Sequence, residues 1–434
     1  MDDRKSERKV GFENSAKGGE HRLQDQRSQN RESEDENHNE RQHATPDYAR
    51  DRPEFGRRAL EDPVQRRAKV VKPGRGRDDE GNSSDRDAEP AARGDFTLED
   101  FAAYDPIWAE PVHTTFRGYD IYSSPSTSRG GFEVAMQLSL VEGFDLKAMG
   151  HNSAETLHVL AEAIKLAKAD IYHYVGDPMF TDIPMAGMLS KEYATERRAL
   201  INRSTAMRYP EAGVPARPTS TGSAWIDTPR GPQFDEESEV GGTTSFSVAD
   251  PFGNVIAATP THGGGFGTGV VVGTTGLLFN NGTRIGSTSP YPDDVNYVRG
   301  GQIPLLNNSP VIVMKDGEFV LAVGSPGGET IGQTQFQTLL NVLEFGMSIQ
   351  EAVAAPRFAL TAEPNFYLPD AEVVMNLESR VGPAVVAALR GLGHQVELAA
   401  PYSLGSNQAI FRDLVTGTFW AGADPRRVAY AVGW

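Results

Sequence analysis

The chain has 434 residues, which is long enough to bury a sizeable core and too long for one ordinary domain. Its 59 acidic and 42 basic side chains give a formal net charge of −17, which argues against a nucleic acid or an anionic membrane as partner. Cysteine is absent, so disulfides, thiolate nucleophiles and cysteine-ligated metals are excluded. No apolar run approaches the roughly 18–20 residues of a membrane span. The opening segment lacks the apolar core of a secretory signal.

Residues 1–94 combine many charged and amide side chains with few large apolar ones. Such a segment cannot bury enough apolar surface to offset the entropy lost on ordering. We therefore predict a disordered tail over 1–94. The alternative is that the start of the chain is misassigned.

The region after the tail predicts a strand, a turn-rich loop and a helix over FRGYDIYSSPSTSRGGFEVAMQL. In the next helix Asn152 is the predicted N-cap, and Glu155 three residues later completes a capping box. Gly176 is predicted to end this helix. Its apolar residues repeat at helical spacing and predict a core face: Leu157, Leu160, Ile164, Ala167 and Ile171.

Proline, glycine and polar residues dominate 208–242, which predicts an exposed linker ending at Gly242. The chain beyond it is predicted to be rich in strands. One hairpin is expected to turn at Asp250–Asn254 and another at Asp316–Gly317, with a pair of short strands between them over GVVVGTTGLLFNN.

A helix after the second hairpin is predicted to carry Phe336, Leu339 and Leu340 on its apolar face, with Leu343. Ser348 and Glu351 predict a second capping box. The segment GPAVVAALRGLGHQVELAA predicts a helix, a glycine stop and a strand. The order of elements is that of an α+β protein.

The segment EVGGTTSFSVAD places Gly-Gly directly before Thr-Thr at the start of a predicted strand. A threonine hydroxyl is a poor nucleophile without an adjacent base. Cleavage before Thr243 would free an α-amine, of pKa roughly 8, within reach of the hydroxyl. The flexible linker before this bond and the rigid strand after it suit such chemistry. By itself, Thr-Thr at a strand start is typical of β-propensity alone.

Residues 95–434 resemble the gamma-glutamyltranspeptidase family of N-terminal nucleophile hydrolases. The likeness rests on segments in one order, among them FTLEDFAAYDP, HVLAEAIKLAKAD, DIPMAGMLSKEY, TTSFSVADPFGNVIAAT, GSPGGETI, EAVAAPRF and GADPRR. It implies an α+β fold, an αββα sandwich preceded by the disordered tail. It also implies four regions: the tail 1–94, a mostly helical remnant of the large subunit 95–207, the linker 208–242 and a strand-rich small subunit 243–434.

The same resemblance implies self-cleavage between Gly242 and Thr243. Thr243 would be the nucleophile, and the Thr261 hydroxyl would lie beside its own. The N–H groups of Gly327 and Gly328 would bind the oxyanion, since glycine permits close backbone approach. A surface strand threonine and a simple turn are the alternatives for Thr261 and the glycine pair.

The expected reaction is hydrolysis or transfer of a gamma-glutamyl-type acyl group, through an ester on Thr243. The donor would be an amide such as glutathione and the acceptor water or an amine. The partners would be the two autoprocessed pieces of one precursor. No cofactor is expected, and the scattered histidines lack metal-site spacing, so no metal is expected either. The family mostly works outside the cytoplasm, often in the periplasm, but this chain shows no export signal, so its location is left open.

The chain departs from the family in three places. The family's N-terminal portion, with an arginine that grips the substrate α-carboxylate, is missing, which would leave the sandwich incomplete. A fragment, a mispredicted gene product and a form completed by another chain all remain open. The glutamine and aspartates that recognise the α-amine are replaced in LFNNGTRIGS, where Arg284 favours an anion. A serine pair is replaced by Leu306 and Asn307, of which Asn307 can hydrogen-bond a carboxylate.

These departures keep two alternatives open. One is an acylase-like amidohydrolase for an amide whose anionic acyl chain lacks an α-amine, with Arg284 at the substrate. Arg284 as a solvated surface residue is the simpler interpretation. The other is an inactive relative that serves as a binding protein.

Overall fold

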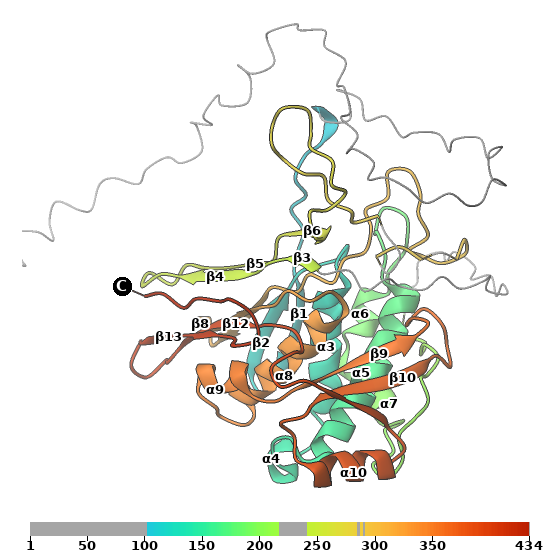
Figure 1. Cartoon of the computed structure of the whole chain (residues 1–434), viewed down its shortest axis with the longest axis vertical. Helices are drawn as coiled ribbons and strands as arrows, with labels where there is room; N and C mark the ends of the chain where they lie inside the picture. The colour runs from blue at the N-terminus through green and yellow to red at the C-terminus, as the bar shows by residue number, and fades with distance from the viewer. Residues whose placement is uncertain (1–101, 217–240, 284–286, 290, 434) are drawn as a thin grey trace, which may run out of the picture. The chain divides into compact units, whose positions relative to one another are not determined.

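The structure is a computed structural model that describes residues 102–216, 241–283, 287–289 and 291–433 (Figure 1). The predicted tail 1–94, most of the predicted linker and Arg284 lie outside the described residues. No helix in the described ranges is long and apolar enough to cross a membrane.

The largest sheet has six strands in the order β1-β2-β7-β8-β12-β13, and every neighbouring pair is antiparallel. The strands are β1 Val112–Phe116, β2 Tyr119–Ser123, β7 Val311–Lys315, β8 Glu318–Gly324, β12 Gln408–Arg412 and β13 Phe419–Ala423. The predicted turn between β7 and β8 is confirmed: Asp316 and Gly317 have φ angles of 52° and 83°. An Asp-Gly pair suits two consecutive positive φ angles, which set the register of such a hairpin. Segments about 200 residues apart in the chain thus share one sheet.

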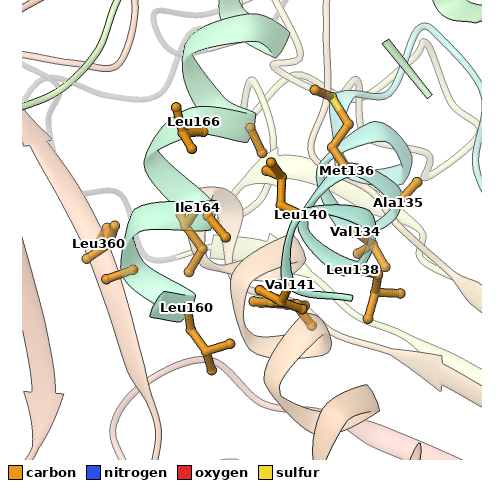
Figure 2. Close-up of a cluster of buried hydrophobic side chains, with 14 of the residues drawn as sticks. Val134, Ala135, Met136, Leu138, Leu140, Val141, Leu160, Ile164, Leu166 and Leu360 are labelled. Carbon is orange, nitrogen blue, oxygen red and sulfur yellow. The ribbon is translucent and has the colours of Figure 1, made fainter. Parts of the chain in front are cut away.

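Three long helices build the core against this sheet: α3 Arg129–Val141, α5 Ala154–Tyr174 and α8 Ile331–Leu343. Helix α3 packs against both other helices and against β1 and β2. Every residue of α3 is buried, as expected of a helix surrounded on all sides. Figure 2 shows Leu140 and Val141 on the side of α3 toward Leu160 and Ile164 of α5, with Val134 and Leu138 on its other side and Leu360 of β9 beyond α5.

The remaining helices are short, and a second sheet lies beside α5 and α10 (Figure 1). The helices are α4 Leu146–Met149, α6 Met185–Met188, α7 Lys191–Arg198, α9 Ile349–Ala354, α10 Pro383–Gly391 and the 3₁₀ turn η1 Gly328–Thr330. The second sheet has the order β11-β10-β9, with β9 Phe358–Glu363, β10 Glu372–Glu378 and β11 Gln395–Ala399. The predicted helix, glycine stop and strand at its end are α10, Gly393 and β11.

Helix capping follows the predictions with one correction. The predicted core face of α5 is buried, but Ser153 caps the helix, because its side chain accepts from the Thr156 N–H at 3.1 Å. Asn152 has a φ of 53°, outside the helix, and its amide donates to Pro356 O at 2.9 Å. The predicted capping box of Ser348 and Glu351 is confirmed.

Two small strand pairs lie on the other face of the six-stranded sheet from α3 and α8 (Figure 1). They are β4 Phe246–Ala249 with β5 Val255–Ala258, and β3 Gly241–Thr243 with β6 Thr261–Gly264. The β4–β5 hairpin turns where the sequence predicted and packs against β8 and β12. The six-stranded sheet therefore has helices on one face and these two strand pairs on the other. In the expected αββα arrangement the two pairs would form part of the sheet that faces the six-stranded one.

The short strand pair predicted over GVVVGTTGLLFNN is present only as a brief antiparallel contact and not as regular strands. Val271 and Leu278 form a bridge, and the N–H groups of Phe279 and Val272 donate to Val270 O at 3.0 Å and Leu277 O at 2.8 Å. Glycines at positive φ, among them Gly269, Gly273 and Gly276, interrupt the extended backbone. The segment is therefore a loop.

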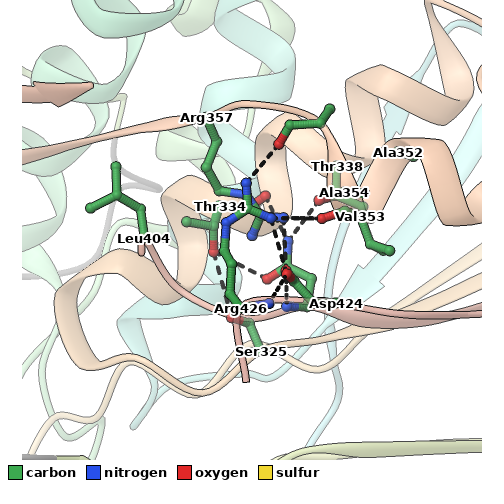
Figure 3. Close-up of polar contacts among 12 residues, drawn as sticks. Ser325, Thr334, Thr338, Ala352, Val353, Ala354, Arg357, Leu404, Asp424 and Arg426 are labelled. Atoms are coloured by element: carbon green, nitrogen blue, oxygen red, sulfur yellow. Dashed lines mark hydrogen bonds and ion pairs between the residues drawn. The ribbon is translucent and has the colours of Figure 1, made fainter. Parts of the chain in front are cut away.

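The C-terminal segment is anchored to the core by a buried polar network (Figure 3). Asp424 accepts from Arg357 at 2.8 Å and from Arg426 at 3.0 Å. Its Oδ2 also accepts from the Asn407 N–H at 2.8 Å, and the Asn407 amide donates to Thr338 Oγ1 of α8 at 2.7 Å. The GADPRR motif thus ties the end of the chain to helix α8.

Ile164 offers a test of the α3–α5 core. Its side chain is fully buried, so Ile164→Ala removes apolar contacts and leaves a cavity. We expect the free energy of unfolding to fall by about 2–5 kcal/mol, measured by urea denaturation followed by circular dichroism. The control Leu398→Ala, at an exposed position on β11, should change it by well under half as much. Equal losses in both variants would contradict this core assignment.

Candidate active site

Thr243 lies opposite Thr261 where the antiparallel strands β3 and β6 pair. The two hydroxyl oxygens are 2.7 Å apart, a hydrogen-bond distance. The Gly263 N–H donates to Thr261 Oγ1 at 2.8 Å, which orients that hydroxyl. Thr261 can therefore direct its own proton at the Thr243 oxygen. The structure brings together the two threonines that the sequence predicted as partners.

Glycines let the backbones of this strand pair approach closely. A Cβ at Gly242 would lie 2.2 Å from the Gly264 carbonyl oxygen, so no larger residue fits there without a shift. The Gly264 N–H donates to Asn281 Oδ1 at 2.6 Å, and the Asn281 N–H donates to His262 O at 2.8 Å. Gly242 is thus a packing requirement of the site as well as the residue before the predicted nucleophile.

The residues after Thr243 lie over the end of β8. The Thr244 N–H donates to Pro260 O at 3.1 Å, and Ser245 Oγ hydrogen-bonds the side-chain amide of Gln408 on β12 at 2.7 Å. A Cβ at Gly324, the last residue of β8, would lie 3.0 Å from the Ser245 Cβ. Because β8 ends shortly before Gly327 and Gly328, the segment of the predicted nucleophile and the glycine turn belong to one region.

The turn at Gly327 and Gly328 has positive φ angles, which glycine adopts readily. Gly327 and Gly328 have φ angles of 137° and 55°, a range that side-chain-bearing residues rarely adopt. Thr330 donates to Gly327 O through its N–H at 3.1 Å and its hydroxyl at 2.9 Å. The turn opens η1 and then α8, so its N–H groups lie at the positive end of a helix dipole. This geometry is compatible with the predicted oxyanion role, which stays a prediction.

Asn307 lies in a buried polar cluster with Arg129 and Glu329, which the sequence analysis did not name as site residues. Its Oδ1 accepts from Arg129 Nε, and its Nδ2 donates to Glu329 Oε1 at 2.7 Å. The neighbouring Asn308 donates to Thr259 O at 2.8 Å, which links this segment to the connection between β5 and β6. Arg129 and Glu329 each adjoin a Gly-Gly pair, in SRGG and GGET. A charged residue beside a Gly-Gly pair at a predicted helix start is the sequence feature that could have predicted this cluster.

The gamma-glutamyltranspeptidase family model matches residues 86–434, most of the chain. The chain belongs to the gamma-glutamyltranspeptidase family. It is 34% identical over 340 residues to the glutathione hydrolase proenzyme of Bacillus subtilis (strain 168), covering 78% of this chain and 55% of that protein. It is 32% identical over 336 residues to the acylase ACY 1 proenzyme of Pseudomonas sp. (strain SE83), covering 77% and 54%.

Among solved structures, the chain is similar to cephalosporin acylase from Bacillus halodurans. The TM-score is 0.65 at 28% identity, over 78% of this chain and 55% of that one. With the family match, this likeness confirms the fold class inferred from the sequence. The chain spans about half the length of the curated glutathione hydrolase proenzymes it matches.

Away from the threonine pair and the glycine turn, the structure brings together two histidines whose sequence spacing did not predict a contact. His158 Nδ1 of α5 lies 2.7 Å from His394 Nε2, and His158 Nε2 lies 2.7 Å from the carbonyl oxygen of Asn202. Glu162 lies in the same group, and its carboxylate is 2.5 Å from Lys165 Nζ. Because these side chains have protein partners, we assign the group to packing between α5 and the segment before β11.

This histidine pair gives a pH-dependent stability. Burial, and then the charge of Lys165 and the nearby His158, lower the pKa of His394 to about 3. In the unfolded chain a histidine side chain has a pKa of about 6.5. The folded protein therefore keeps this imidazole neutral, and the resulting stability is complete above about pH 6.5 and is lost as the pH falls toward 3. The slope from this group is at most about 1.4 kcal/mol per pH unit.

We expect His394→Asn to flatten the pH dependence of unfolding in that interval. The measurement is the urea midpoint at a series of pH values, compared with wild type. His262→Asn changes an exposed histidine of β6 and serves as the control that should keep the wild-type slope. An unaltered slope in His394→Asn would rule out this residue as its source.

Proposed function

We propose that this chain is a gamma-glutamyltransferase-like enzyme that cleaves itself between Gly242 and Thr243. It then hydrolyses or transfers a gamma-glutamyl-type acyl group from an amide donor such as glutathione. The observation that carries the proposal is the 2.7 Å contact between the hydroxyls of Thr243 and Thr261 on paired strands. Relatives named glutathione hydrolase proenzyme support both the substrate class and the processing.

Each step follows from groups at this site. Once the peptide bond before Thr243 is broken, the neutral α-amine takes the hydroxyl proton as the oxygen attacks the donor carbonyl. The Thr261 hydroxyl donates to the attacking oxygen, and the N–H groups of Gly327 and Gly328 stabilise the oxyanion. The intermediate collapses to an ester on Thr243, and the α-ammonium protonates the leaving amine. Water or an acceptor amine then attacks the ester and regenerates the free hydroxyl.

An acylase-like amidohydrolase is the second candidate. It is favoured by the relative named acylase ACY 1 proenzyme and by the cephalosporin acylase structure. The absence of carboxylates in LFNNGTRIGS points the same way, because an α-ammonium group would lack its usual partner there. Arg284 would then contact an anionic acyl chain, a role that lies outside the described residues and stays a prediction.

Self-cleavage is tested by the mass of the purified full chain. Wild type should give two pieces with Thr243 as a new N-terminus, because its hydroxyl is required to break the bond. Thr243→Ala should stay intact, while the control Thr244→Ala should still split. The readout is denaturing gel electrophoresis with intact mass spectrometry. A wild-type chain that never splits would instead favour the inactive binding protein.

Substrate class is tested on the split protein with gamma-glutamyl-p-nitroanilide and glutaryl-p-nitroanilide, which differ by the α-amine. The primary proposal expects the gamma-glutamyl compound to have a kcat/KM higher by about tenfold or more, since one charge-assisted hydrogen bond contributes about 1.5–3 kcal/mol. The measurement is release of p-nitroaniline. Preference for the glutaryl compound would favour the acylase alternative over the transferase.

A further inference from the structure

We propose that Glu329 is a positioning residue, which anchors the preceding Gly327–Gly328 turn to helices α3 and α5. The inference rests on the proposed function, since the turn is the predicted oxyanion site. Glu329 lies in η1, directly after the turn, so its side chain and the turn backbone move together.

The Glu329 carboxylate is held by four donors. Oε1 accepts from Arg129 Nη2 and, at 2.7 Å, from Asn307 Nδ2. Oε2 accepts from Tyr172 Oη at 2.5 Å and from Lys168 Nζ at 3.2 Å. A carboxylate offers about four lone-pair positions, so these partners use its full capacity. They come from α3, from α5 and from the segment before β7, which are distant from one another in the chain.

Two buried cations contact this carboxylate, whose own side chain is 23% exposed. Arg129 and Lys168 are each 1% exposed, and the Arg129 guanidinium lies 4.3 Å from the centre of the Tyr172 ring. Lys168 also pairs with the buried Glu133 at 3.2 Å, so two cations face two carboxylates. Burial alone raises the pKa of Glu329, but the charges of Arg129 and Lys168 outweigh it and lower this pKa to about 2. Glu329 is therefore ionised throughout the working range of pH.

The turn needs such an anchor because two consecutive glycines are conformationally permissive. Thr330 holds the Gly327 carbonyl, and Gln333 Nε2 donates to Glu329 O at 3.0 Å, but these contacts lie within the same local segment. The Glu329 side chain connects that segment to α3 and α5 through the contacts described above. Loss of its charge would leave buried cations with too few partners and would release the turn.

Since the donors fill the carboxylate, Glu329 has no free lone pair for a substrate ammonium group. Its removal should therefore reduce kcat, through a misplaced oxyanion site, and leave KM nearly unchanged. Loss of an aligned oxyanion donor typically costs about 10²–10³-fold in kcat. A residue that bound substrate directly would instead change KM.

The test compares Glu329→Gln with the control Glu344→Gln, which breaks the ion pair of Glu344 with Arg117 beyond the far end of α8. On split protein with gamma-glutamyl-p-nitroanilide, we expect kcat of Glu329→Gln to fall about 100-fold with KM within about threefold. The control should keep the wild-type kcat. Hydrogen exchange of a peptide covering 325–331 should become faster in Glu329→Gln and stay unchanged in the control.

Tyr172→Phe is a milder second variant, which removes one neutral donor and keeps both cations. It should shift kcat and the exchange rate in the same direction by a smaller factor, and it carries the test if Glu329→Gln does not fold. Unchanged exchange and kcat in the folded variants, or a rise in KM at constant kcat, would overturn the positioning role. A wild type without turnover would contradict the proposed function instead, while the exchange comparison would still decide the role of Glu329.

Discussion

The pairing of β3 with β6 is the constraint on which the rest of the site depends. Two threonine hydroxyls meet at 2.7 Å only because the strands that carry them approach closely at Gly242 and Gly264. Any side chain at Gly242 would meet a backbone oxygen, so the same glycine that precedes the predicted nucleophile also sets the strand spacing. The chemistry and the packing of this region are therefore not independent of each other.

Buried helices lie on the other side of the main sheet from this strand pair (Figure 1). Helix α8 begins at the glycine turn, and its later residues are tied to the C-terminal segment through Asn407 and Asp424. The beginning of the same helix is tied to α3 and α5 through Glu329. A helix held at both places can keep its N-terminal N–H groups in a constant position, which is what electrostatic stabilisation of an oxyanion requires.

The buried charged side chains described here have hydrogen-bond or ion-pair partners. The cluster around Glu329 places Arg129 and Lys168 beside two carboxyl groups, and the network around Asp424 pairs it with Arg357 and Arg426. Such groups are costly to bury singly and tolerable when each has its hydrogen bonds. The histidine pair of His158 and His394 follows the same rule, because each ring has the other as a partner.

The sequence by itself determined the local elements and the two threonines of the site. Three local predictions are confirmed because they depend on neighbouring residues alone. They are the Asp-Gly turn between β7 and β8, the capping box of Ser348 and Glu351, and the apolar repeat of α5. After β6 the predicted strand pair is reduced to one bridge with flanking hydrogen bonds, because glycines at positive φ interrupt the extended backbone. Tertiary structure alone decided that Asn307 contacts Glu329 and that His158 contacts His394, since partners this far apart in the chain meet only through packing of whole elements. Tertiary structure also decided the N-cap of α5. Asn152 has a positive φ and donates to Pro356 O, so Ser153 is the capping residue.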